Sequence, residues 1–139
     1  MRLFDTDFII DLTNSQPGAI QYAKAVDVEA SLSAISAVSV HEYLFGVYLT
    51  YRHDKEEEEE LDRRVVSARN ELDRFETIPV TREIAEASSR LQATLTAEGV
   101  QLGINDAYIA ATATHYGLTL VTRNTKHFKH VPKLKLEHY

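Results

Sequence analysis

The sequence predicts an α/β fold: a three-layer α/β/α sandwich around a short, mainly parallel central sheet. Short apolar runs alternate with stretches of helical periodicity, and helices separate the successive strand candidates. Strands joined through helices pair in parallel, because the helical crossover brings the chain back to the same end of the sheet. No internal repeat and no Pro/Gly-rich linker divides the 139 residues, so residues 1–139 are expected to form a single domain.

The strand candidates are short apolar runs bounded by polar or turn-forming residues. The first is Leu3–Phe4, which Asp5 cuts short, and the remaining candidates follow in chain order: Ala34–Ile35, 77–80, 118–122 and 134–137.

The helices of the first half follow from apolar residues at three- and four-residue steps. After a turn at Gln16–Gly18, the first such series is Ala19, Ala23, Val26 and Ala30. The clearest stripe predicts a helix over 39–52 and consists of Val40, Tyr43, Leu44, Val47, Tyr48 and Tyr51. A second long helix follows, with one face made of Leu61, Val65, Ala68, Leu72 and Phe75.

The helix ends of the second half carry capping residues. Thr81 can cap a helix that Gly99 ends. Asn105 or Asp106 is expected to begin the next helix, which Gly117 stops.

Composition narrows the function classes. The chain has no cysteine, which excludes disulfides, thiol catalysis, zinc fingers and iron–sulfur clusters. No apolar stretch approaches the roughly 18 residues of a membrane span, and the first residues do not resemble a signal peptide. We therefore expect a cytoplasmic protein that does not associate with a membrane. The net charge of −6 argues against indiscriminate nucleic-acid binding. Basic residues nevertheless outnumber acidic ones over 123–139, where a polyanion can bind locally.

Three acidic residues stand where such a fold presents its active site. Asp5 follows the first strand, Glu42 follows the second, and Asp106 opens the helix before the strand at 118–122. In open parallel sheets, ligands bind outside the carboxyl ends of the strands. Carboxylates gathered there repel one another unless a cation neutralises them, and an all-oxygen set suits Mg²⁺ or Mn²⁺. The pattern therefore favours a divalent-metal enzyme that acts on phosphodiesters.

Each acid also has a purely structural interpretation, and these alternatives stay open at this point. Asp5 can cap the following helix. The stretch Ser39–Glu42 fits an S-x-x-E capping box, in which the glutamate closes on the backbone of the cap. Asp106, like Asp7, can be a first-turn acid that answers the helix dipole.

Other polar and aromatic groups are expected to be structural. The run Glu56–Glu60 predicts a solvated helix face, since consecutive residues point around the whole helix and cannot converge on one ion. The histidines show no metal-ligand spacing and are expected to be surface residues. Tyr43, Tyr48 and Tyr51 are expected to make core or oligomer contacts.

Four segments of the sequence form one recognisable pattern. They are Leu3-Phe4-Asp5-Thr6-Asp7, then Ile35-Ser36-Ala37-Val38-Ser39-Val40-His41-Glu42-Tyr43, then Asn105-Asp106-Ala107-Tyr108-Ile109-Ala110-Ala111-Thr112-Ala113, and finally Gly117-Leu118-Thr119-Leu120-Val121-Thr122-Arg123-Asn124. Together they resemble the PIN-domain family, specifically the VapC-type toxins of bacterial and archaeal toxin–antitoxin pairs.

The resemblance implies a PIN-like fold and an endoribonuclease in which Asp5, Glu42 and Asp106 form an acidic Mg²⁺ site, where Mn²⁺ can substitute. It also implies a small antitoxin protein as partner. Many relatives carry a further acid where this chain has Asn124, and often another where it has His127. Asn124 can ligate through its amide oxygen but adds no charge, so a second tightly held metal ion does not follow from the resemblance.

Substrate contacts and self-association complete the sequence-based expectations. Arg123 and Lys126 are candidates for binding RNA phosphates, with ordinary surface charge as the alternative. The predicted helix 39–52 carries more apolar residues than one buried stripe needs, which predicts a homodimer.

Two other functions remain possible from the sequence. Asp5-Thr6-Asp7 after a strand also fits the start of a haloacid-dehalogenase-type phosphatase, in which the first Asp is a nucleophile. The other alternative is a non-catalytic or housekeeping PIN-like RNA-binding protein. The RNA target is not predicted.

Overall fold

The computed structural model describes residues 1–28, 32–51 and 55–139. Within them, one all-parallel sheet has the strand order β3-β2-β1-β4-β5. Its strands are β1 (Arg2–Phe4), β2 (Ser33–Ser36), β3 (Glu76–Ile78), β4 (Thr119–Val121) and β5 (Lys135–Glu137). The sequence-based strand candidates are therefore confirmed, with ends that shift by one to a few residues.

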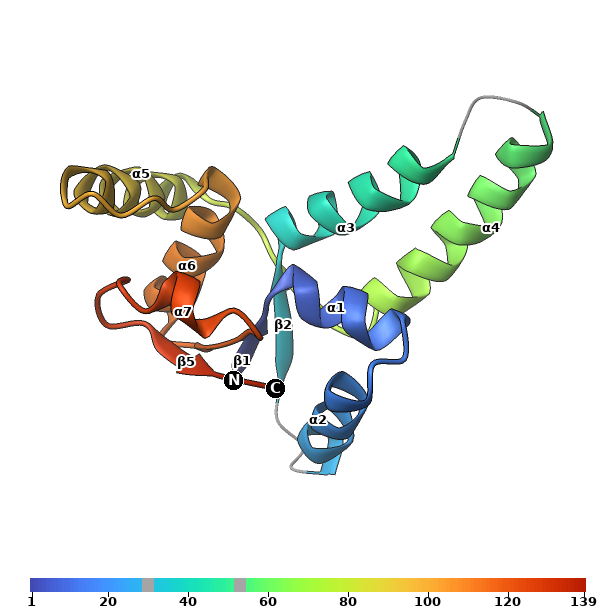
Figure 1. Cartoon of the computed structure of the whole chain (residues 1–139), viewed down its shortest axis with the longest axis horizontal. Helices are drawn as coiled ribbons and strands as arrows, with labels where there is room; N and C mark the ends of the chain where they lie inside the picture. Colours follow the sequence, from blue (N-terminus) through green and yellow to red (C-terminus); the bar gives the residue numbers. More distant parts are fainter. Residues whose placement is uncertain (29–31, 52–54) are drawn as a thin grey trace.

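Helices cover both faces of this sheet, as Figure 1 shows. One face carries α1 (Thr6–Thr13), α2 (Pro17–Val28), α3 (Ala37–Thr50) and α4 (Lys55–Leu72). The other face carries α5 (Arg82–Ala97), α6 (Ile104–Tyr116) and the short α7 (Thr125–Phe128). The predicted three-layer α/β/α sandwich is confirmed.

The two faces arise from the alternation of side chains along each strand. Leu3 and Leu120 belong to the core cluster beneath α5 and α6, whereas the next residues along the same strands, Phe4 and Val121, belong to the cluster beneath α1 to α4. All four side chains are at most 1% exposed. A strand buried on both sides reads as a continuous apolar run, which explains why the central strands were recognisable in the sequence.

Several predicted helix ends are confirmed. The Thr81 hydroxyl accepts a hydrogen bond from the Ile84 backbone N–H at 3.3 Å and caps α5. Gly99 and Gly117 follow α5 and α6 in the left-handed conformation, with φ of 77° and 66°. Ala30 and position 52, which were assigned to helices from the sequence, lie outside the described residues.

The structure contradicts the capping box at Ser39–Glu42, which was the structural alternative for Glu42. Helix α3 begins at Ala37, and Ser36 is its N-cap, accepting a hydrogen bond from the Val38 backbone N–H at 3.2 Å. Ser39 is buried inside the helix, where its hydroxyl bonds to none of the described residues. Glu42 therefore lies in the second turn and neither opens nor caps the helix.

The C-terminal residue is fixed to α1. The Tyr139 hydroxyl donates a hydrogen bond to Asp11 Oδ2 at 2.8 Å, and its ring packs edge-on against Phe8 at 4.9 Å. Burial, followed by the Asp11 carboxylate, raises the pKa of this tyrosine above its usual value. Asp11 also accepts hydrogen bonds from Arg123 Nη1 at 2.9 and 2.8 Å. The chain end, the segment after β4 and α1 therefore form one polar junction.

The acidic run at the start of α4 behaves as predicted where it is described. Glu58 and Glu59 are exposed, and Glu60 pairs with Arg63 and Arg64 on the helix surface. Among the described residues, no helix is both long enough and apolar enough to cross a membrane.

Two glycines should respond to alanine with opposite signs. Gly117→Ala forces a side chain into a left-handed conformation and should lower the free energy of unfolding by about 1–2 kcal/mol. Gly46→Ala, inside α3 with no atom near the added Cβ, should raise it by about 0.5–1 kcal/mol. Urea denaturation followed by circular dichroism measures both. Equal effects of the two substitutions would contradict the assignment of the α6 terminus.

Candidate active site

The acidic residues expected from the sequence line one pocket of about 540 Å³. The pocket opens at the carboxyl ends of β1 and β4. From β1 the chain continues to β2 on one side, whereas β4 lies on the other, so this is the point where the strand order reverses. The lining residues are Asp5, Thr6, Asp7, Ile10, His41, Glu42, Phe45, Asn105, Asp106, Asn124, His127 and Phe128.

Asp5 is held at the base of the pocket, where it is 7% exposed. Its carboxylate accepts hydrogen bonds from the Thr6 backbone N–H and from the Thr122 hydroxyl, each at 2.8 Å. Burial raises the pKa of Asp5, and with the negative charges of Asp7 and Asp106 acting in the same direction and the hydrogen bond from Thr122 opposing them, the pKa reaches about 6. Asp5 is thus both the N-cap of α1 and a pocket carboxylate, so the two sequence-based interpretations hold together.

Glu42 is positioned by donors from two other elements. The Thr6 hydroxyl, at the start of α1, donates to Glu42 Oε1 at 2.7 Å. Asn105, in the first turn of α6, donates through its side-chain amide to Oε2 at 3.3 Å. Both carboxylate oxygens are therefore oriented by neutral groups.

Asp106 faces a histidine. Its Oδ2 lies 2.7 Å from Nε2 of His127, a residue of α7 that also lines the pocket. The histidines were expected to be surface residues, and His127 is so only in part, since its side chain is 34% exposed and is bonded to Asp106. His41 also lines the pocket, stacked on Phe45 with ring centroids 6.0 Å apart.

The remaining candidate residues lie at different distances from the acids. Asn124 lines the pocket and precedes α7 without capping it through its side chain. Arg123 pairs with Asp11 and, through Nε, with Asp7 at 3.4 Å. The charge of Asp7, followed by that of Asp11, raises the pKa of this guanidinium. Lys126 is exposed on α7 and is not part of the pocket wall.

The donor set fits Mg²⁺ or Mn²⁺. Carboxylate oxygens predominate, with an amide and an imidazole at the edge, and the raised pKa of Asp5 shows that burial and like charges penalise the ionised form in the absence of a cation. Among the described residues, no three acidic or histidine side chains already surround a single point. Hydrogen bonds to neighbouring donors hold the carboxylates apart, so binding an ion requires side-chain rotation.

Sequence reasoning missed the groups that orient the acids, namely Thr6, Thr122 and Asn105. A threonine between two aspartates at a strand end was the available signal for Thr6. No local signal identified Thr122, because its partner Asp5 lies at the other end of the chain.

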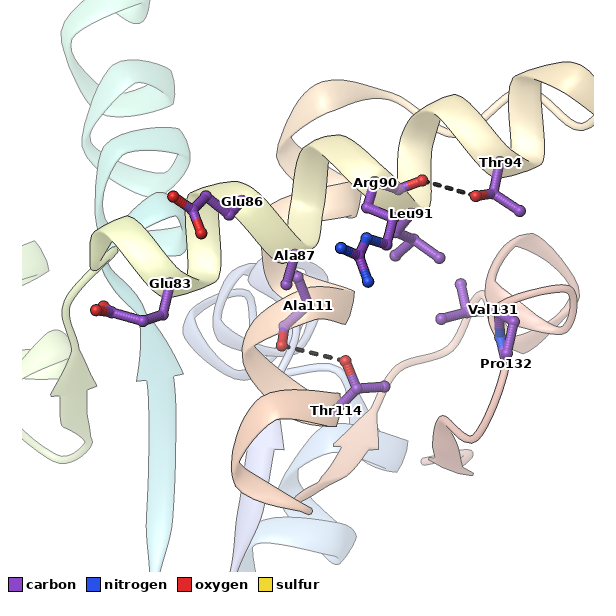
Figure 2. A pocket seen from close by; sticks show the side chains of 10 residues that line it. All are labelled: Glu83, Glu86, Ala87, Arg90, Leu91, Thr94, Ala111, Thr114, Val131 and Pro132. Carbon is purple, nitrogen blue, oxygen red and sulfur yellow. Dashed lines mark hydrogen bonds between the residues drawn. The ribbon is translucent and has the colours of Figure 1, made fainter.

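A second pocket, between α5, α6 and the turn at 131–132, lacks such chemistry (Figure 2). The hydroxyls of Thr94 and Thr114 donate to carbonyls of their own helices, at Arg90 and Ala111. No acidic cluster forms there among the described residues. The chemistry is concentrated at the carboxyl ends of the strands.

A parallel α/β sheet with carboxylates at its switch point places the candidate site where such folds bind their ligands. Comparison with known proteins is more specific. The family model for the PIN domain matches residues 2–134, so the chain belongs to the PIN domain family.

Relatives extend along the whole chain. Ribonuclease VapC2 from Haemophilus influenzae is 25% identical over 137 residues, which cover 99% of this chain and 96% of that protein. A toxin–antitoxin complex from Klebsiella pneumoniae contains a chain 31% identical, with a TM-score of 0.67 and coverage of 96% and 95%. VapBC2 from Rickettsia felis, solved with a promoter DNA fragment, gives 26% identity, a TM-score of 0.77 and coverage of 99% and 98%. The resemblance to VapC-type PIN proteins is confirmed.

The raised pKa of Asp5 has a consequence for stability. The folded state holds this proton more tightly than the unfolded state, so the group's contribution is complete below about pH 4 and is lost as pH rises through about 6. Asp5→Asn does not ionise. Its stability relative to wild type should therefore grow between these pH values and then stay constant, on the order of 1–3 kcal/mol.

The measurement is urea denaturation in EDTA across this pH range. Asp73→Asn, which alters an exposed carboxylate outside the pocket, is the matched control and should show no such change. A difference between wild type and Asp5→Asn that does not vary with pH would refute the burial argument.

Proposed function

We propose that this protein is a Mg²⁺-dependent endoribonuclease, the toxic component of a type II toxin–antitoxin pair in the cytoplasm. The observation that carries the proposal is the convergence of Asp5, Glu42 and Asp106 on one pocket. A PIN-domain chain with full-length ribonuclease relatives supports it.

The surroundings of each acid suggest a different role for it in the reaction. Asp5 and Asp106 would hold the metal ion, and Mn²⁺ can replace Mg²⁺. When bound, the ion lowers the pKa of a water and stabilises charge on the phosphate. Glu42, fixed by Thr6 and Asn105, is a further ligand or the acceptor that orients the attacking water. Asn124 contributes an amide oxygen at the rim.

RNA phosphates would be bound beside the pocket. Lys126 is exposed on α7, next to a wall residue, and can reach a flanking phosphate. Arg123 is engaged by Asp7 and Asp11, so its first contribution would be to hold α1 in place.

A groove beside the acidic pocket is suited to binding an antitoxin. A pocket of about 480 Å³ between α1, α3 and α4 includes Tyr43, Val47 and Ala68, and it shares Ile10 and Glu42 with the acidic pocket. An apolar helix lying there would bring its end to the carboxylates. An arginine at that end would pair with them and block entry of both metal and phosphate.

A homodimer is proposed on the exposed side of α3. Phe45, Tyr48 and Leu49 are 56%, 48% and 72% exposed, an unusual apolar excess for one helix. Light scattering should report twice the mass of one chain at micromolar concentration.

One of the two alternative functions is excluded and the other is left to experiment. The match to the PIN domain family removes the haloacid-dehalogenase-type phosphatase. A housekeeping or non-catalytic PIN-like RNA-binding protein is the outcome that the following experiments would identify.

Cleavage is the direct test. Wild-type protein should cut RNA with Mg²⁺ or Mn²⁺, and Asp5→Asn or Asp106→Asn should each reduce the rate at least ~100-fold, because each removes a charge that holds the ion. Glu59→Gln removes an equal charge from the exposed face of α4 and should cut normally. Full cleavage in excess EDTA, or by either Asn variant, would overturn the assignment.

Toxicity is tested separately. Expression of the chain alone should arrest host growth, and co-expression of a small protein encoded beside it should restore growth. Val66 is exposed outside the groove, so Val47→Asp should abolish rescue while Val66→Asp should not, if the groove binds the antitoxin. An active nuclease that leaves growth unaffected at high expression would instead be a housekeeping enzyme.

A further inference from the structure

Packing against the core holds His127 in the acidic pocket. Its ring lies edge-on to Phe128, with centroids 5.4 Å apart and an interplanar angle of 86°. Phe128 is 1% exposed and belongs to the core beneath α5 and α6. The neighbouring core residue therefore fixes α7 and directs the imidazole of His127 toward Asp106.

The distance between these two side chains suits a shared cation. His127 Nε2 and Asp106 Oδ2 are 2.7 Å apart. Two ligands at ~2.1 Å from an octahedral ion, at a right angle, are about 3.0 Å apart. Replacing the shared proton by a metal ion thus requires the two atoms to separate by about 0.3 Å, together with a rotation of both side chains that turns their lone pairs toward the ion.

The nitrogen changes which metal the pocket prefers. Mg²⁺ favours oxygen ligands and gives up its water reluctantly, so it depends on negative charge in the site. Mn²⁺ is the weakest binder in the divalent transition-metal series, but as a transition-metal ion it accepts an imidazole nitrogen more readily than Mg²⁺ does. Asn124 and His127 both contribute neutral donors to the rim, which weakens the pull on Mg²⁺ and adds a ligand suited to Mn²⁺.

We propose that His127 is a ligand of the bound metal ion, together with Asp5 and Asp106, and that it makes the pocket selective for Mn²⁺ over Mg²⁺. This inference rests on the proposed function in taking the acidic pocket as the metal site. It does not require that the chain cut RNA.

The test measures metal binding without RNA. Protein stripped with EDTA is titrated with MnCl₂ or MgCl₂ by calorimetry, and bound Mn²⁺ is examined by electron spin echo spectroscopy for nitrogen coupling. Wild type should bind Mn²⁺ at least ~10-fold more tightly than Mg²⁺ and show the nitrogen of an imidazole.

The variants separate ligation from hydrogen bonding. In His127→Gln, the amide can still donate to Asp106, but the imidazole nitrogen is gone. This variant should lose the nitrogen coupling and bind Mn²⁺ ~10-fold more weakly, with Mg²⁺ affinity changed less than ~3-fold. His127→Asp should favour Mg²⁺ by adding charge. His41→Ala, which removes the other pocket imidazole, should leave Mn²⁺ affinity and the nitrogen coupling unchanged.

The outcomes distinguish the two proposals. Mn²⁺ bound without nitrogen coupling, or an unchanged Mn²⁺/Mg²⁺ ratio in folded His127→Gln, overturns the role of His127 and leaves the nuclease proposal standing. Nitrogen-coupled Mn²⁺ in a protein that cuts no RNA supports the role of His127 and overturns the nuclease proposal. No binding of either ion at this pocket overturns both.

Discussion

The structure depends most on the carboxylate of Asp5 at the carboxyl end of β1. This group is buried at the point where the sheet changes direction, and it joins three elements: it ends β1, caps α1 and receives the hydroxyl of Thr122 after β4. A polar group at that depth must be hydrogen-bonded, and a charged one is disfavoured by desolvation. Its raised pKa records that cost. Moving β4 or α1 would remove one of the two hydrogen bonds that this carboxylate accepts.

The other acids are organised in the same manner, by donors from elements remote in the chain. Glu42 on α3 is held by Thr6 from α1 and by Asn105 from α6. Asp106 on α6 faces His127 from α7. These contacts connect helices from both faces of the sheet across its carboxyl edge. The site therefore exists only once the layers have assembled, and its geometry reports the packing of the entire sandwich.

The sequence predicted what depends on local pattern and strand ends. The proximity of Asp5, Glu42 and Asp106 could be predicted, because parallel strands present their carboxyl ends at one edge of the sheet. The start of α3 was misplaced, since Ser36 and Ser39 are both good caps and only the length of β2 decides between them. Helix α7 was missed because four residues carry no period, and its anchor, Phe128, is defined only by the core that it enters. His127 was noted only as standing where relatives often carry an acid, and its contact with Asp106 was not predicted.

The choice of donors explains how a cluster of acids can be orderly without an ion and still accept one. A hydrogen bond from a neutral hydroxyl or amide contributes about 1 kcal/mol net to stability. This is small compared with the free energy gained when a cation neutralises buried carboxylates that repel one another. An arginine in the pocket would bind the acids as a two-pronged fork and compete with the ion. This chain holds Arg123 just outside, against Asp7 and Asp11, where it braces α1 and the C-terminal Tyr139. The pocket is thus left to weak internal donors, so that a cation from outside can displace them, whether it is a metal ion or an arginine brought by a partner protein.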